Sequence, residues 1–449
     1  MSDYERLRQL DSKHMIHTFL PLETRDRTIF VKGKGCNLWD VAGREYLDMT
    51  GGLWLAQIGH GRPEMAEAAA KQMSTLEYAT AFWEFSNDKA IALAAKLATL
   101  SPTGLDVVYF TSGGSESNDA AIKTARLFHA HRGEPERTWI LSRNDAYHGL
   151  AYGGGTATGF DGLKAGVGPG IGHVHHLTPP KPFQTWRYNG QSTTDFCIAE
   201  LEATIARIGS KNIAAMIGEP VMGVGGMVIP PDDYWPRVAQ VLRKNGILLI
   251  LDEVVTAFGR IGSWFGADKY NVKPDILVTA KGISSGYIPL GAVLMTREIA
   301  DAVCEGHGFP VGYTYSGHPV ACAIALENLR ILEEERLVER ANVMGQYFSD
   351  GLQRIKDLPS VGEIRHAGLG IAIELVADKK TGQPLPDNVI PDVIKRESGV
   401  IVRMANENVL VMSPPLVITE SEADRAIEAV SSVLERVRAD GSISSAAAA

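Results

Sequence analysis

The chain has 449 residues, of which 45% are hydrophobic, and its formal net charge at pH 7 is -9. This length and composition predict two or three domains with substantial cores and exclude a mainly disordered chain. The negative charge and the lack of a long basic run argue against nucleic acid or an anionic membrane surface as a partner. No run of about 18 apolar residues is free of charge, and the N-terminal residues lack the apolar core of a signal peptide, so we expect a soluble, cytoplasmic protein.

The first predicted element is a hairpin over residues 36–58, with a turn at Ala42–Gly43. From about residue 60 onward, helical patterns alternate with short runs that are apolar on both faces. This alternation predicts an α/β fold in which a mostly parallel sheet lies between helical layers. In such sheets, ligands bind at the carboxyl ends of the strands. The strand candidates are DVVYF, NIAAMIGEP, GILLILDEV, DILVTAKG and GAVLMT.

The C-terminal part of the chain has a different pattern. A helix is predicted over residues 318–358, and short strand candidates follow it before a last amphipathic helix, SEADRAIEAVSSVLERVRAD. We interpret this part as a smaller α+β domain that packs with the N-terminal hairpin. The expected organisation is an N-terminal segment over residues 1–60 that joins the small domain, a large domain over residues 61–325, and a C-terminal small domain over residues 326–449.

The cysteines and histidines do not predict a metal site. The cysteines show neither a C-x-x-C motif nor a regular spacing, which is typical of reduced cysteines that pack in a cytosolic protein. The histidines of the HVHH stretch fit no common zinc pattern, and packing in a strand or loop is the favoured interpretation. These residues are Cys36, Cys197, Cys304 and Cys322, together with His173, His175 and His176.

A carboxylate, Asp252, ends the apolar run ILLIL. Two kinds of site place an acid at such a strand end: a magnesium site for a nucleotide, and a charge partner for a cationic cofactor. The nucleotide site requires a phosphate loop, G-x-x-x-x-G-K-[ST], after another strand. The chain has no such loop, so a nucleotide hydrolase is disfavoured. We assign no chemistry to the neighbouring Glu253, which we expect to be a packing or dimer-edge residue.

A glycine pair and two serines follow the strand candidate DVVYF in the stretch TSGGSESND. Gly113 and Gly114 let backbone amides approach an anion closely, Ser115 offers a hydroxyl, and the N-terminus of the following helix favours negative charge. Because no lysine is present, the loop suits a phosphate monoester better than a triphosphate. A capped helix after a tight turn explains the same residues equally well.

Lys281 follows the strand candidate DILVTA directly, between Ala280 and Gly282. A desolvated lysine with a lowered pKa is a nucleophile that forms Schiff bases. Taken alone, a lysine at a strand end is more often a solvated surface residue. Together with a phosphate-binding loop and the carboxylate of Asp252, however, it completes the three anchors that pyridoxal 5'-phosphate needs.

Motifs along nearly the whole chain resemble those of class III aminotransferases of the pyridoxal-phosphate fold type I, in the branch of amine and ω-amino acid:pyruvate aminotransferases. The resemblance implies a large domain with a mostly parallel seven-stranded sheet between helices, and a smaller α+β domain formed by the N- and C-terminal segments. It implies ping-pong transfer of an amino group from a primary amine or ω-amino acid to pyruvate, which gives alanine. The motifs are LWDVAGREYLDMTGGLW, FTSGGSESND, AYHG, GEPVMGVGGMVIPP, LDEVVTAFGRIGSWFG, TAKGISSGYIPLGAV, GYTYSGHPVACA and IVRMANENVLVMSPPL.

The resemblance also implies roles for the residues around the cofactor ring. Lys281 is similar to the family's Schiff-base lysine, and Asp252 to the aspartate that faces the pyridine nitrogen. A carboxylate there keeps that nitrogen protonated, which an amide does not do. Val254 is expected to pack against one face of the ring, and Tyr147 to cover the other face with His148 beside it.

Further residues are implied around the phosphate. Gly114 and Ser115 resemble the phosphate-binding residues, and Glu219 is implied in a supporting role, with Tyr147 or Arg260 as its partner. Thr314 is similar to a threonine that reaches the phosphate from the partner subunit. The resemblance therefore implies a homodimer with shared active sites, and leaves a tetramer open.

Substrate binding is implied at three positions. Arg403 corresponds to a mobile arginine that pairs with a substrate carboxylate and swings away for an apolar amine. Trp54 and Phe82 are expected to supply apolar walls, although simple core packing explains them nearly as well. The partners are thus small-molecule amines and keto acids, and the YSGHP motif resembles the pyruvate-using branch more than the 2-oxoglutarate-using one.

Other functions share these anchors. An aminomutase, a decarboxylase or a 2-oxoglutarate-linked aminotransferase uses the same cofactor and differs in the bond that is broken or the acceptor that is used. A pyridoxal-phosphate-sensing regulator requires a basic DNA-binding domain. Since no segment of the chain is left over for such a domain, the regulator is disfavoured.

Overall fold

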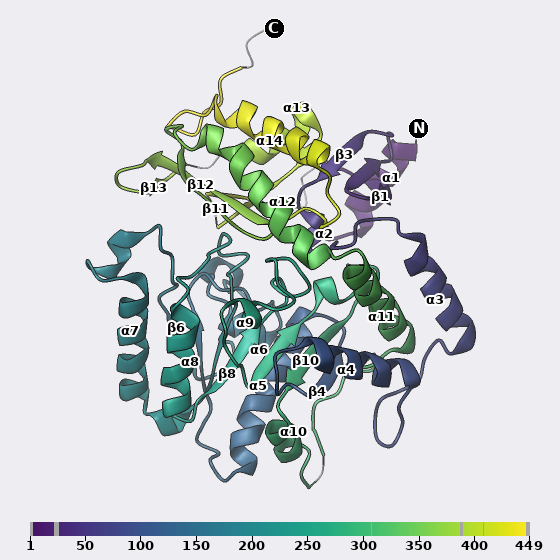
Figure 1. Cartoon of the computed structure of the whole chain (residues 1–449), viewed down its shortest axis with the longest axis vertical. Coiled ribbons are helices and arrows are strands. Elements are labelled where there is room, and N and C mark those ends of the chain that lie inside the picture. Colours follow the sequence, from purple (N-terminus) through teal and green to yellow (C-terminus); the bar gives the residue numbers. More distant parts are fainter. Residues whose placement is uncertain (1–2, 22–26, 307, 387–388, 407, 446–449) are drawn as a thin grey trace.

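A seven-stranded sheet forms the centre of the larger part of the molecule in the computed structural model, which describes residues 3–21, 27–306, 308–386, 389–406 and 408–445 (Figure 1). β10 runs antiparallel to both of its neighbours, and the other strand pairs are parallel. The predicted mostly parallel sheet is therefore confirmed. In spatial order the strands are β4 (Val107–Thr111), β10 (Gly291–Met295), β9 (Ile276–Thr279), β8 (Leu248–Asp252), β7 (Ile213–Gly218), β5 (Trp139–Arg143) and β6 (Val174–Leu177).

Both faces of this sheet are buried, because successive side chains of a strand point to opposite faces. In β8, Ile250 belongs to one hydrophobic cluster, while Leu249 and Leu251 belong to another. Helices pack on each side: α5 and α10 contribute to the cluster of Ile250, and α4, α7, α8 and α11 contribute to the other cluster, which also includes residues from the C-terminal part of the chain. The helices are α3 (Pro63–Thr75), α4 (Asp88–Leu100), α5 (Gly114–His131), α6 (Tyr152–Ala157), α7 (Thr193–Ile208), α8 (Tyr234–Lys244), α9 (Gly266–Lys269), α10 (Arg297–Val303) and α11 (Pro319–Glu334).

A smaller α+β part contains both ends of the chain and lies above the large sheet in Figure 1. Its first sheet has the order β11-β12-β16-β15, with β13 beside β12, and its second has the order β1-β2-β3-β14. The elements are α1 (Asp3–His14), β1 (Phe30–Lys34), β2 (Asn37–Asp40), β3 (Glu45–Asp48), α2 (Gly51–Trp54), α12 (Leu337–Leu352), β11 (Val361–Ala367), β12 (Gly370–Asp378), β13 (Gln383–Pro384), α13 (Ile390–Ser398), β14 (Val400–Ile401), β15 (Arg403–Ala405), β16 (Val409–Met412) and α14 (Glu420–Leu434). Short 3₁₀ helices are η1 (Asp161–Leu163), η2 (Thr185–Tyr188), η3 (Ser210–Asn212), η4 (Lys281–Ile283) and η5 (Gln353–Ile355).

The two chain ends share a sheet. The predicted N-terminal hairpin is confirmed by the antiparallel pairing of β2 with β3, and β14 from the C-terminal part pairs with β3 in parallel. This pairing supports a small domain made from both ends of the chain, and the domain division remains our proposal. Since α11 runs across residue 325, we place the boundary after this helix rather than inside it.

The single helix predicted over residues 318–358 is wrong. The structure has two helices there, α11 and α12, and Arg336 between them adopts a left-handed conformation with φ 51° and ψ 45°. The hydrophobic pattern continues on both sides of the break, and neither glycine nor proline marks it. The break therefore has no local signal in the sequence.

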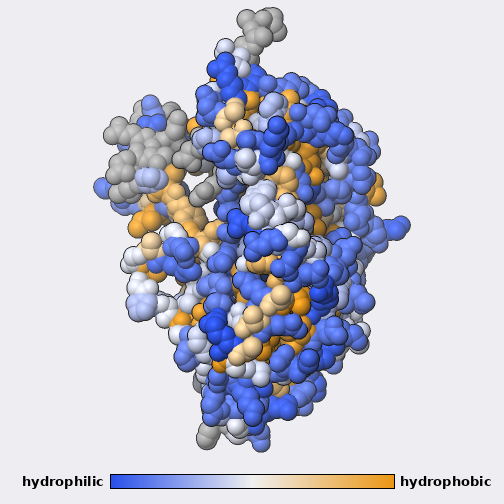
Figure 2. Space-filling view, turned by 90° about the vertical axis from the view of Figure 1, so that its left-hand side faces the viewer, coloured by the Kyte–Doolittle hydropathy of each residue, from blue (hydrophilic) through white to orange (hydrophobic). Residues whose placement is uncertain are grey.

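The surface is mostly hydrophilic on the face shown in Figure 2, with hydrophobic side chains confined to small patches. Within the residues that the structure describes, no helix combines the length and the apolar character needed to cross a membrane. Three cysteines are buried, as predicted, but Cys304 is exposed, so the packing prediction is wrong for that residue.

The conformation of Arg336 leads to a stability prediction. A left-handed conformation costs an L-residue roughly 1–2 kcal/mol, which glycine avoids, although its more flexible unfolded state offsets part of the gain. We expect Arg336→Gly to increase the free energy of unfolding by about 0.5–1 kcal/mol. The measurement is the midpoint of thermal unfolding, with Arg336→Ala as the control that keeps the strain. Equal midpoints for the two variants would contradict the prediction.

Candidate active site

Asp252 is the last residue of β8, and its side chain is 3% exposed. Its Oδ2 atom accepts hydrogen bonds from His148 Nδ1 at 2.7 Å and from Asn118 Nδ2 at 2.8 Å. Its Oδ1 atom accepts only from the backbone N–H of Val254, at 3.1 Å, among the residues described. Three elements therefore orient the carboxylate, and Oδ1 keeps a lone pair for a further donor such as a protonated ring nitrogen.

Asn118 is a site residue that the sequence reasoning missed. It lies in α5, one helical turn after Gly114, and its amide also donates to the carbonyl oxygen of His148 at 3.1 Å. The i, i+4 spacing within SGGSESND was the available signal, because residues four apart share one face of a helix. The amide connects the helix that begins at Gly114 with the acid at the end of β8.

Lys281 follows β9 and begins η4 in a left-handed conformation, with φ 47°. Its Nζ atom lies 5.5 Å from the centre of the Trp54 ring. Burial lowers the pKa of Lys281 to about 8; Asp252 and Glu219 oppose this shift, whereas Arg403 and Arg260 add to it. Residues from five separate segments thus influence one amine, as expected at the carboxyl edge of the sheet.

Glu219 follows β7 and is buried. Its Oε1 accepts from the backbone N–H of Tyr147 at 3.0 Å, and its Oε2 from the backbone N–H of Gly223 at 2.9 Å. Burial raises the pKa of Glu219. The expected partner Tyr147 is thus present through its backbone. The prediction that Arg260 could pair with Glu219 is wrong. The guanidinium of Arg260 faces the small domain and donates to the carbonyl oxygens of residues 369 and 414.

The N-terminus of α5 fits a phosphate group. Gly113 occupies the N-cap position without a side-chain cap, so the first amides of an 18-residue helix have no side-chain acceptor there. A Cβ atom added to Gly113 would meet nothing within 4 Å, which leaves room for an anion. A Cβ atom added to Gly114 would lie 3.0 Å from both methyl groups of Val254, so glycine lets the helix begin beside that residue. Ser115 lies in the first turn of the same helix.

Thr314 and Phe82, which the resemblance implies at the site, lie away from Lys281 in the single chain. Thr314 is exposed, and its carbonyl oxygen accepts a hydrogen bond from Tyr78 Oη at 2.9 Å. Phe82 packs close to the same segment, since a Cβ atom on Gly312 would lie 2.6 Å from the tip of its ring. No contact described for either residue reaches Lys281 within one subunit.

Trp54 and Arg403 do lie near Lys281. Trp54 is buried, and its ring faces the amine as described above. Arg403 begins β15 and is half-buried; burial lowers its pKa, and the nearby Tyr147 opposes the shift. Within the described part of the chain, the guanidinium of Arg403 has no hydrogen-bond or ion-pair partner. It is therefore available to a ligand.

Glu253 has a structural role. It is fully buried, and it accepts from the backbone N–H groups of Gly266 and Ala267 at 2.7 Å each and from Thr256 Oγ1 at 2.5 Å. These bonds tie the loop after β8 to the N-terminus of α9, and burial raises the pKa of Glu253 to about 7. The expectation that Glu253 is a packing residue is confirmed. The alternative expectation, a residue at the edge of a dimer, is wrong because the side chain is fully buried within the single chain.

The histidines of HVHH have other contacts. His173 stacks on Trp139 with ring centres 5.0 Å apart, and His176 Nε2 lies 3.1 Å from the carbonyl oxygen of Ala157. His175 lies 3.2 Å from the guanidinium of Arg207. Within the described ranges of the chain, no group of three or more His, Cys, Asp or Glu side chains is arranged to hold a metal ion.

The lowered pKa of Lys281 predicts how covalent attachment of pyridoxal phosphate depends on pH. Only a neutral amine attacks an aldehyde, and this amine is half neutral near pH 8. In cofactor-free protein we expect the rate of attachment to rise with pH and to level off above about 8, rather than above the ordinary lysine value of about 10. Stopped-flow absorbance measures the rate, and Lys281→Ala is the control that forms no covalent bond. A rate that still climbs at pH 10 would contradict the assignment.

Comparisons with known proteins agree with this geometry. The family model described as Aminotransferase class-III matches residues 22–434. A putrescine–pyruvate aminotransferase from Pseudomonas aeruginosa is 37% identical over 428 residues, which cover 93% of this chain and 92% of that protein. The structure of an (S)-enantioselective omega-transaminase from Thermomicrobium roseum is 45% identical, has a TM-score of 0.92, and covers 96% of this chain and 98% of that chain. An amine transaminase from an uncultivated Pseudomonas species, in its PLP-bound form, is 40% identical with a TM-score of 0.88, and covers 93% of this chain and 96% of that chain.

The buried acid, the desolvated lysine and the uncapped helix N-terminus form the three anchors for one cofactor, at the sheet edge where ligands bind. These residues fit pyridoxal phosphate. The chain belongs to the class III aminotransferases, which are pyridoxal-phosphate-dependent enzymes of fold type I.

Proposed function

We propose that this aminotransferase moves an amino group from a primary amine or ω-amino acid to pyruvate, which gives alanine. The observation that carries the proposal is the free guanidinium of Arg403, which influences the charge of Lys281. An arginine binds a carboxylate through two parallel hydrogen bonds, so it suits both pyruvate and an ω-amino acid. The similarity to a putrescine–pyruvate aminotransferase supports a donor amine and this acceptor.

Lys281 and Asp252 are proposed to carry the chemistry. When bound, pyridoxal phosphate supplies a ring that accepts electrons from the substrate carbon. Asp252 Oδ1 is placed to hold the proton of the ring nitrogen, and the hydrogen bonds of Asn118 and His148 hold the carboxylate in position. Lys281 Nζ, neutral in part at physiological pH, takes the proton from the substrate carbon and returns it.

The remaining residues are proposed to hold the cofactor. Val254 packs against Gly114 at the start of α5 and supplies one wall of the ring site. Tyr147, whose backbone is held by Glu219, supplies the opposite wall. Gly114 and Ser115 contribute backbone amides at the helix N-terminus, where the dipole favours the phosphate.

We further propose a homodimer in which Thr314 of one subunit reaches the phosphate of the other. Thr314 is exposed in the single chain, and exposed aromatic residues lie in its own segment and in the segment of Phe82, which packs against Gly312. Trp83 is 84% exposed and Tyr315 is 61% exposed. Exposed apolar groups of this size are typical of surfaces that a partner covers. Phe82, beside this segment, is proposed to join the substrate pocket in the same assembly.

The role of Asp252 predicts the effect of a conservative change. Asn in place of Asp252 keeps a hydrogen bond but cannot stabilise a positive charge on the ring nitrogen. We expect Asp252→Asn to lower the rate of transamination by about 10²–10³-fold, the size of effect seen when an electrostatic group is removed from an active site. Steady-state rates measure the loss, and circular dichroism checks that the fold is kept. Turnover close to that of the wild type would refute the role.

The role of Arg403 predicts a difference between donors. Loss of one charge-assisted carboxylate contact corresponds to about 10–100-fold in kcat/KM. We expect Arg403→Ala to cause this loss for β-alanine and pyruvate, but a loss below about threefold for benzylamine, which has no carboxylate. Single amines are mixed with the cofactor-loaded enzyme without an acceptor, and the bleaching of the visible absorbance is followed; pyruvate is then mixed with the bleached enzyme, and the return of the absorbance is followed. Equal losses for all three compounds would argue against the proposed function of Arg403.

A further inference from the structure

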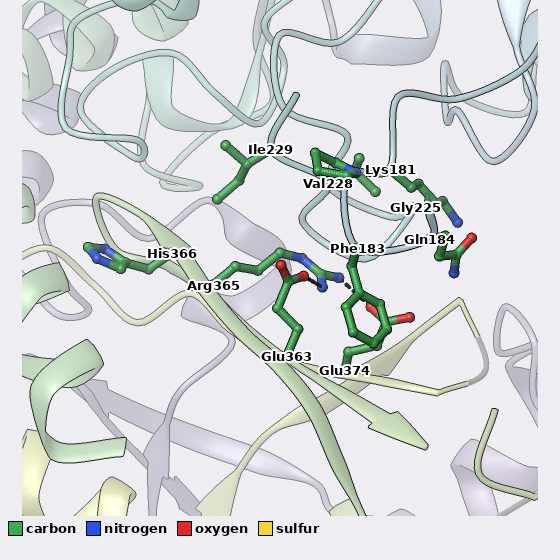
Figure 3. A pocket seen from close by; sticks show the side chains of 11 residues that line it. Lys181, Phe183, Gln184, Gly225, Val228, Ile229, Glu363, Arg365, His366 and Glu374 are labelled. Carbon is green, nitrogen blue, oxygen red and sulfur yellow. Dashed lines mark hydrogen bonds and ion pairs between the residues drawn. The ribbon is translucent and has the colours of Figure 1, made fainter. Parts of the chain in front are cut away.

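A cavity of about 320 Å³ lies between strands β11 and β12 of the small domain and two loops of the large domain (Figure 3). The side chain of Arg365 extends into it from β11, and Figure 3 shows its guanidinium beside the carboxylates of Glu363 and Glu374. The large-domain loops contribute residues 181–184 and residues 225–229. The cavity is thus a junction between the two parts of the molecule, separate from Lys281 and Asp252.

Arg365 connects the two parts through all three of its nitrogens. On the small-domain side, Nη1 donates to Glu363 Oε2 at 2.6 Å and Nη2 to Glu374 Oε2 at 2.7 Å. On the large-domain side, Nε donates to the carbonyl oxygen of Met227 at 3.0 Å and Nη2 to that of Gly226 at 2.5 Å. The side chain is only 13% exposed. A planar fork of donors makes this set of bonds, whereas the single ammonium group of a lysine cannot span it.

The turn that Arg365 holds also forms part of the active site. This turn, residues 223–228, begins with Gly223, whose N–H donates to Glu219 Oε2 at 2.9 Å. A Cβ atom added to Gly223 would lie 2.4 Å from the ring of Trp54, so the backbone of the turn lies directly on that ring. A shift of the turn therefore moves the wall that Trp54 forms beside Lys281.

The same turn contacts the hairpin that carries Arg403. Asn406 Nδ2 donates to the carbonyl oxygen of Gly225 at 3.4 Å, and a Cβ atom on Gly226 would lie 2.8 Å from a methyl group of Val409. In this hairpin, β15 pairs with β16, and β16 pairs with β12, the strand that carries Glu374. Arg365 therefore spans the turn and the sheet from which Arg403 projects.

We propose that Arg365 is a positioning residue that sets the separation between Arg403 and the Trp54 wall, and thereby the preference for donors that carry a carboxylate. The inference rests on the proposed function of Arg403. Without the guanidinium of Arg365, the turn and the hairpin lose their shared anchor. The guanidinium of Arg403 then no longer lies at the distance from the Trp54 wall that the carboxylate of the donor requires. A donor without a carboxylate does not use Arg403, so the separation between Arg403 and the Trp54 wall does not determine its rate.

Arg365→Lys tests the inference in the cofactor-loaded enzyme. The half-reaction is followed with β-alanine and with benzylamine, and calorimetry measures the affinity for propionate, a carboxylate that cannot react. We expect the concentration of β-alanine that gives the half-maximal rate to rise about tenfold, with the maximal rate changed by less than about twofold. Propionate affinity is expected to fall in parallel, and the values for benzylamine to stay within about twofold.

Arg354→Lys is the matched control. Arg354 also bonds a carboxylate, that of Glu428, and a carbonyl oxygen, but both partners lie in α14 within the small domain. This variant is expected to behave like the wild type for both donors. If Arg354→Lys weakened β-alanine and propionate as much as Arg365→Lys does, any disturbance of the small domain would suffice to weaken them. That result would overturn the inference.

A second variant keeps the inference testable if Arg365→Lys does not fold. Asn406→Gly removes the side-chain contact with Gly225, and glycine accepts the left-handed conformation of residue 406, with φ 44°. We expect it to weaken β-alanine and propionate by about threefold with benzylamine unchanged. If Arg403→Ala separates the two donors but Arg365→Lys and Asn406→Gly do not, the inference about Arg365 fails alone. If Arg403→Ala affects both donors equally, the proposed function of Arg403 fails, and the inference fails with it.

Discussion

The hydrogen bonds around Asp252 are the interaction on which the rest of the site depends. A carboxylate that is 3% exposed at the end of an apolar strand is costly unless donors surround it. The donors are Asn118 from α5, His148 from the segment before α6, and the N–H of Val254 in the loop after β8. The same three segments supply the helix terminus that we propose to bind the phosphate and the two walls that we propose for the ring site. Orienting the acid therefore also brings the cofactor's other contacts together.

The charges around Lys281 are balanced in a way that suits its chemistry. Burial and the two guanidinium groups of Arg403 and Arg260 favour the neutral amine, while Asp252 and Glu219 favour the charged one. The result, a pKa of about 8, lets the amine act as a base and be reprotonated at physiological pH. A substrate carboxylate that neutralises Arg403 would weaken one of these effects. The proposed binding of a substrate carboxylate by Arg403 and the proposed proton transfer by Lys281 are thus electrostatically linked.

Much of the fold was predictable from the sequence, and the exceptions have physical causes. Apolar runs such as the one before Asp252 predicted the buried strands, because a strand covered on both faces has no polar positions. The strand VHHL was not among the strand candidates, although packing in a strand or loop was the favoured interpretation of its histidines; their polar atoms find partners such as the carbonyl oxygen of Ala157. The break at Arg336 was missed because neither a glycine nor a proline marks the left-handed residue, and the hydrophobic pattern continues on both sides of it. The positions of Lys281 and Asp252 were predictable because each stands at the end of an apolar run, Asp252 as the last residue of β8 and Lys281 two residues after β9. The contact between Asn118 and Asp252, in contrast, joins residues 134 positions apart.

The sequence by itself determined the chemistry of this protein: an acid and a lysine at strand ends and a glycine-rich helix start specify the functional groups, and their order matches a family. Functional groups and local spacing are properties of the chain, so they can be read without coordinates. Only the tertiary structure decided that Arg403 has no partner among the residues described, and that Arg260 faces the small domain. It likewise decided that Glu253 ties a loop to α9, and that Arg365 joins the turn beside Trp54 to the sheet of Arg403. Each of these depends on contacts between distant segments, which packing of the whole core selects and no local pattern encodes.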